Sequence, residues 1–127
     1  MSNSFQIPPD VEAETKMRDK DCVYCHEPLR SKAELKALGI GYKTERTLEH
    51  LYHKEPFYWK GKLGKPGGLT KSGIAYCCRS CNSSRGANPL SVWFKGDYCV
   101  LNKINELTVA APVTEYIKSR QKIDGIY

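Results

Sequence analysis

At 127 residues, the chain is long enough for one domain and short for two. Apolar residues make up 40% of it and charged residues 27%, so the hydrophobic core is expected to be thin and to gain from a cross-link. The formal net charge of +6 slightly favours a polyanionic partner such as nucleic acid over a basic surface without a partner. No apolar run approaches the roughly 18 residues of a membrane span, so no membrane partner is expected.

The amino-terminal stretch MSNSFQIPPD has neither the basic start nor the apolar run of a secretory signal. We therefore expect a cytoplasmic protein whose thiols stay reduced. That expectation favours a metal site over disulfides as the role of the cysteines.

The predicted elements alternate between short helices and two strands. Ser31 followed by Glu34 has the pattern of a capping box at a helix start, and Gly39 or Gly41 is expected to end that helix. The segment 55–72 is rich in Gly, Lys and aromatic residues and is predicted to be a long loop. Helices are predicted at 10–20, 31–38, from about 82 to 94 and at 113–121, and strands at 46–51 and 74–78.

Four of the six cysteines form two C-x-x-C pairs, CVYC and CRSC. Two-residue spacing lets both thiolates of a turn face one ion, and two such turns complete a tetrahedral site. We therefore predict a structural zinc ion. Its ligands would be Cys22, Cys25, Cys78 and Cys81.

Two cysteines and one histidine remain near this pattern. Cys77 and Cys99 are interpreted as small buried apolar residues. His26 follows the first pair directly and could replace a cysteine as a ligand, although an exposed side chain is the preferred interpretation.

Between the two cysteine pairs lies TLEHLYHKEP, which holds Glu49, His50 and His53. Neighbouring residues on a strand point to opposite faces, but a strand end could still bring Glu49 and His50 to one pocket. A carboxylate that binds a hard divalent cation and an imidazole that takes a proton from water would make a hydrolytic site. An ordinary polar surface strand is the equally weighted alternative.

Together these motifs resemble the HNH endonuclease family. The resemblance rests on CVYC, on the pair EH, and on CRSCN followed by SSRG, and it covers residues 18–94. It implies an α+β fold, a small zinc-stapled ββα-metal domain with flanking helices, formed by 1–127 as a single domain with a C-terminal helical extension at 95–127. It also implies a prokaryotic or phage-infected host cell as the setting.

The resemblance implies a role for each site residue. Glu49 and Asn82 would hold a catalytic Mg²⁺ or Mn²⁺ ion, and His50 would be the general base, a role that a pKa near neutrality suits. Separately from the resemblance, His53 could add a ligand or steady the scissile phosphate, and plain surface exposure is the alternative interpretation. The sequence departs from the family at the middle Asn, where Ser72 and Gly73 stand instead, so Ser72 or the backbone would orient the base.

The expected partner is DNA. Arg85 lies three residues after Asn82 and could reach a phosphate, with a solvated arginine as the alternative. The aromatic residues Phe57, Tyr58 and Trp59 lie among basic ones, as in surfaces that follow a nucleic-acid backbone, and some of them are expected to be buried. The lysines expected to face DNA are Lys60, Lys62, Lys65 and Lys71.

The sequence thus predicts a metal-dependent DNA endonuclease that nicks one strand per active site. The alternative is a zinc-ribbon module that binds nucleic acid without chemistry. An apolar stripe is expected along the last helix, and its packing back on the domain is favoured over a two-fold interface, so we expect a monomer or a weak homodimer. The stripe consists of Val109, Val113, Tyr116 and Ile117.

Overall fold

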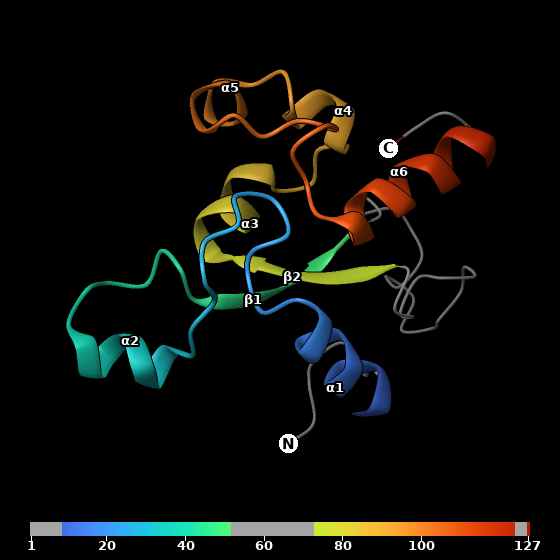
Figure 1. Ribbon diagram of the computed structural model, residues 1–127. Coiled ribbons are helices and arrows are strands. Elements are labelled where there is room, and N and C mark those ends of the chain that lie inside the picture. The colour runs from blue at the N-terminus through green and yellow to red at the C-terminus, as the bar shows by residue number, and fades with distance from the viewer. Residues whose placement is uncertain (1–8, 52–72, 124–126) are drawn as a thin grey trace.

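In the computed structural model, which describes residues 9–51, 73–123 and 127, the chain forms a small α+β domain around a two-stranded antiparallel ribbon. Figure 1 shows α1 on one side of this ribbon and α3, α4 and α5 on the other. The elements are α1 (Pro9–Arg18), α2 (Lys32–Leu38), β1 (Arg46–His50), β2 (Ile74–Cys78), α3 (Arg79–Arg85), α4 (Leu90–Trp93), α5 (Asp97–Asn102) and α6 (Ala111–Ile123).

The ribbon confirms both predicted strands. Its register pairs Arg46 with Cys78 at one end and His50 with Ile74 at the other. Beyond His50, the backbone N–H of Leu51 donates to the carbonyl of Gly73 at 3.0 Å, so pairing continues one step past the strands. All five residues of β2 are buried, which fits its apolar sequence.

An ion pair ties the end of α1 to β2. Arg18 and the adjacent Asp19 form a bidentate pair, with Nε to Oδ1 and Nη2 to Oδ2 both at 2.7 Å. Asp19 is buried and also accepts the backbone N–H of Tyr76 at 3.0 Å, while Arg18 donates to the carbonyl of Ile74 at 2.9 Å. A buried carboxylate with these partners is satisfied and fixes the position of the helix.

The capping box predicted for α2 is confirmed. The Ser31 side chain accepts from the backbone N–H of Glu34 at 3.1 Å, and the Glu34 carboxylate accepts from the backbone N–H of Ser31 at 2.9 Å. Gly39 ends the helix in the left-handed conformation, with φ of 68°, where a side chain would be strained.

The single helix predicted from about 82 to 94 is wrong. α3 begins earlier, at Arg79, because the Cys78 sulfur caps it by accepting from the Cys81 backbone N–H. It ends at Arg85 with Gly86, φ of 57°, as its C-cap, and Pro89 is the N-cap of the separate helix α4. The sequence analysis also missed α5.

The hydrophobic core lies where these helices meet the ribbon. Trp93 and Phe94 are buried as expected, and Tyr24 meets Trp93 edge to face at a centroid distance of 4.9 Å. The stripe on and before α6 packs back on the domain, because all four of its residues are buried within the one chain. Among the described helices, none combines the length and the apolar composition that crossing a membrane would require.

Candidate metal centre and candidate active site

The four predicted zinc ligands lie together. Their sulfur atoms are all within 4.8 Å of one another, although Cys22 and Cys25 precede α2 and Cys78 and Cys81 lie at the β2–α3 junction. The Cys25 and Cys78 sulfurs are 3.7 Å apart. A tetrahedral zinc site with Zn–S bonds of about 2.3 Å requires sulfur atoms about 3.8 Å apart, so the four cysteines could hold a zinc ion.

Backbone N–H groups in both turns point at sulfur. The Tyr24 N–H donates to the Cys22 sulfur at 3.5 Å, and the Cys81 N–H donates to the Cys78 sulfur at 3.4 Å. Such bonds stabilise negative charge on sulfur, which is the ligand form of cysteine. The turns are therefore shaped for thiolates.

The thiols do not ionise equally. Hydrogen bonds from the neighbouring thiols hold the pKa of Cys22 far below its usual range, whereas hydrogen bonding with Cys22 raises the pKa of Cys78 and of Cys81. Four adjacent thiolates repel one another, so a cation is needed before all four can lose their protons. This donor set fits zinc.

The remaining candidates near the cluster lie outside it. His26 is exposed, and its Nε2 lies 2.5 Å from the carbonyl oxygen of Thr108. Cys77 and Cys99 are fully buried, and burial raises the pKa of both thiols, that of Cys99 to about 11. These two cysteines are therefore apolar packing residues, as expected.

Glu49 lies inside the protein, on the opposite half of the ribbon from the cysteines. It is 4% exposed, and its Oε2 accepts hydrogen bonds from Tyr24 Oη and, at 2.9 Å, from Arg85 Nη1. Burial and the Glu49 charge raise the pKa of the Tyr24 phenol well above its usual range, so Tyr24 stays a donor. The carboxylate is the acceptor of a buried ion pair.

Arg85 is 1% exposed, and this corrects the expectation that it contacts DNA. Besides Glu49, its guanidinium donates to the carbonyls of His50 at 3.1 Å, Leu51 at 2.6 Å and Asn88 at 2.9 Å. These bonds satisfy a charge that would be costly to bury alone. Arg85 thereby joins the end of α3 to the end of β1.

His50 is half-buried at the end of β1. Alternation along the strand puts its side chain on the face opposite to Glu49. Burial and the nearby Arg85 guanidinium lower the pKa of His50 from 6.5 to about 4. The imidazole is therefore uncharged at neutral pH but a weaker base than an ordinary histidine, and the expectation of a pKa near neutrality is wrong.

Asn82 holds the first turn of α3 against β1. Its side-chain amide donates to Thr47 Oγ1 at 3.0 Å and to the carbonyl of Leu48 at 2.8 Å. A hard cation binds the other end of a carboxamide, the carbonyl oxygen. Asn82 thus lies beside the strand that carries Glu49 and His50.

Several predicted site residues lie outside the described residues: His53, Ser72, Lys60, Lys62, Lys65 and Lys71. Gly73 is buried, and its carbonyl accepts the Leu51 N–H next to His50. The Gly73 backbone therefore lies beside the strand end that carries His50.

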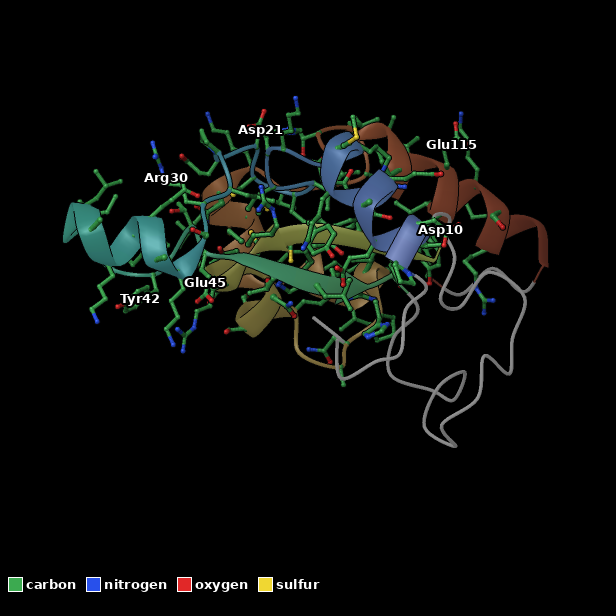
Figure 2. The ribbon with its side chains drawn as sticks, turned by 90° about the horizontal axis from the view of Figure 1, so that it is seen from below. Asp10, Asp21, Arg30, Tyr42, Glu45 and Glu115 are labelled. Carbon is green, nitrogen blue, oxygen red and sulfur yellow. The ribbon has the colours of Figure 1, made fainter. Side chains whose placement is uncertain are left out.

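The sequence analysis missed a group of exposed cations around α2. Figure 2 shows Arg30, Tyr42 and Glu45 at the end of the molecule that carries α2, with Glu115 at the other end. The acids there are engaged, since Glu34 closes the capping box and Glu45 lies 3.5 Å from Arg79. The exposed cations are Arg30, Lys32, Lys36, Lys43 and Arg79. Four of them lie at 30–43, within and on both sides of the predicted helix 31–38, and this clustering was the available signal.

Comparisons of the chain with protein-family models, with curated proteins and with solved structures find no match.

Proposed function

We propose that the chain is a metal-dependent DNA endonuclease of HNH type with a structural zinc ion. His50 is the general base in this proposal. Glu49 and Asn82 would hold a catalytic Mg²⁺ or Mn²⁺ ion, and the four clustered cysteines would hold the zinc.

One observation carries the proposal. The side chain of Asn82 is bonded to β1 at Thr47 and Leu48, directly before Glu49 and His50. Glu49, His50 and Asn82 therefore belong to one β1–α3 unit, with His50 on the face of β1 opposite to Glu49, and the cysteine cluster anchors this unit at the start of α3. These are the groups that metal-assisted hydrolysis of a phosphodiester uses.

The reaction assigned to this unit is attack of water on phosphorus. His50 takes a proton from the water, the oxygen–phosphorus bond forms, and the bond to the leaving 3′ oxygen breaks, with solvent protonating that oxygen. A divalent ion, when bound, stabilises negative charge on the phosphate oxygens. The exposed cations around α2 and the net charge of +6 fit a polyanionic substrate.

Glu49 limits how well the divalent ion is held. Arg85 and Tyr24 both bond its Oε2, so Oε1 is the oxygen that remains for the ion. The adjacent guanidinium opposes a second cation. We therefore expect weak divalent binding.

The same contacts favour one second candidate, a zinc-stabilised module that binds nucleic acid without chemistry. A carboxylate engaged by Arg85 and Tyr24 has an architectural role that needs no divalent ion. Such a module would use the cations around α2 for phosphate contacts, which carry no sequence information.

Supercoiled plasmid incubated with zinc-loaded protein separates the two functions. The endonuclease forms nicked circles with Mg²⁺ or Mn²⁺ and none when these ions are withheld. The binding module retards the plasmid in a gel and leaves it supercoiled under every divalent ion. Retardation without nicking would overturn the proposed endonuclease.

A further inference from the structure

Tyr98 reaches the cysteine cluster from α5, which lies outside the segment 18–94 that carries the cysteine motifs. Its hydroxyl oxygen is 3.3 Å from the Cys81 sulfur and 2.9 Å from the Ser80 hydroxyl oxygen. Neither zinc ligation nor the proposed chemistry requires a tyrosine at this place.

The charge of the sulfur sets the direction of these hydrogen bonds. A metal-bound thiolate carries no proton and can only accept, so the Tyr98 hydroxyl must donate to Cys81. The Ser80 hydroxyl then donates to the oxygen of Tyr98. The Cys81 backbone N–H is already directed at Cys78, so Tyr98 supplies Cys81 with a donor of its own.

The Tyr98 phenol is held in place through Trp93, which in turn contacts α3. The ring of Tyr98 stacks on Trp93 with a centroid distance of 6.0 Å and an interplanar angle of 23°. The Trp93 indole N–H donates to the Ser84 hydroxyl on α3 at 3.0 Å. The hydroxyl position is thus fixed relative to the helix that carries Cys81, as an effective outer-sphere partner requires.

We propose that Tyr98 is a positioning residue of the metal centre, whose hydroxyl donates to the Cys81 thiolate and strengthens metal binding. The hydrogen bond draws electron density from the sulfur and makes it less reactive toward protons and electrophiles. The segment after the motifs therefore completes the metal centre as well as the core. This inference requires only that the cysteines bind metal, and it is independent of the nuclease proposal.

The test compares Tyr98→Phe with wild type and with Tyr42→Phe, which removes a hydroxyl from a half-buried ring beside Lys32. Zinc affinity is measured by competition with a chromophoric chelator, and thiol reactivity by the rate at which a disulfide reagent releases zinc. Tyr98→Phe keeps the ring stack, so we expect an unchanged circular dichroism spectrum, about tenfold weaker zinc binding and faster release. Tyr42→Phe should match wild type.

Equal zinc affinity and release rate in Tyr98→Phe and wild type would overturn the proposal. If Tyr98→Phe does not fold, cadmium-loaded wild type decides the question by nuclear magnetic resonance. The proposal requires a slowly exchanging Tyr98 hydroxyl proton with scalar coupling to ¹¹³Cd. A Tyr98 hydroxyl that exchanges freely and shows no coupling would contradict it.

Discussion

The two ends of the β1–β2 ribbon are stabilised in different ways. At the end where Arg46 pairs with Cys78, four sulfur atoms gather from two short turns. At the other end, a buried carboxylate and a buried guanidinium meet from segments 36 residues apart in sequence. The first end is arranged for a metal ion, and the second satisfies its charges within the protein.

Helix α3 connects the two ends. Cys81 and Arg85 are one turn apart on its buried face, the first in the cysteine cluster and the second in the ion pair with Glu49. A metal ion that fixes Cys81 therefore also fixes the residue that holds the end of β1. The proposed active site therefore depends on the cysteine cluster through the short helix α3.

Disruption of the cysteine cluster should have the largest effect on the stability of the protein. Cys81→Ser removes one of four ligands, and because metal binding contributes directly to folding, we expect a chain without a cooperative thermal transition. Zinc content after purification without chelator and thermal unfolding provide the measurement. Cys99→Ala is the matched control, since Cys99 is buried outside the cluster, and it should keep its zinc and its transition. A zinc-free protein with wild-type stability would contradict a structural metal.

Disruption of the buried Glu49–Arg85 ion pair should have the second largest effect on stability. Arg85→Met leaves the Glu49 carboxylate buried without its cation, which costs about 3–5 kcal/mol of unfolding free energy. The double variant Glu49→Gln with Arg85→Met should recover part of this loss, because no uncompensated charge remains. Urea unfolding of wild type, Arg85→Met, Glu49→Gln and the double variant, at equal zinc content, measures the coupling. Additive losses would show that the pair is not coupled.

The pH dependence of folding stability also distinguishes the two ends of the ribbon. The pKa of His50 is about 4 in the folded protein against an ordinary value of 6.5, so the unfolded chain binds more protons between these values. Stability should therefore fall as pH falls from 6.5 to 4, by at most about 1.4 kcal/mol per pH unit. His50→Gln should lose this part of the slope while keeping the part that metal release contributes. The unfolding free energy of each protein is measured in urea at several pH values. If it falls with pH equally steeply in wild type and in His50→Gln, the lowered pKa of His50 is contradicted.

The smallest effect on stability is expected at α2, which lies outside both ends of the ribbon. Ser31→Ala removes the capping box of α2 and should cost about 1 kcal/mol. Zinc content should stay unchanged, because α2 contributes no ligand to the cluster. Chemical unfolding with metal analysis measures both quantities, and loss of zinc would mean that α2 and the metal end are coupled.

Local patterns allowed much of this structure to be predicted from sequence. The capping box, both strands and the four clustered cysteines depend on residues close in sequence or on a spacing that metal chemistry dictates. The single helix predicted through Gly86 is wrong because Gly86 and Pro89 interrupt the helix between α3 and α4.

The role of Arg85 could not be read from its distance to Asn82 alone. Spacing indicates which helix residues share a face, whereas the burial of that face depends on Tyr24 and Glu49, which are distant in sequence. A usable signal was present nonetheless. Arg85 lies four residues after Cys81, and a metal ligand at the start of a helix turns that face inward.

The most direct test of the proposed chemistry compares His50→Ala with His26→Ala on supercoiled plasmid. Both variants lose one imidazole, and His26 is exposed and outside the cysteine cluster. At equal zinc content and with Mg²⁺ or Mn²⁺, His26→Ala should produce nicked circles before linear DNA at the wild-type rate. His50→Ala should bind DNA normally but lose at least about 100-fold in nicking rate. A His50→Ala protein that nicks at the wild-type rate would contradict the assignment of His50 as the base.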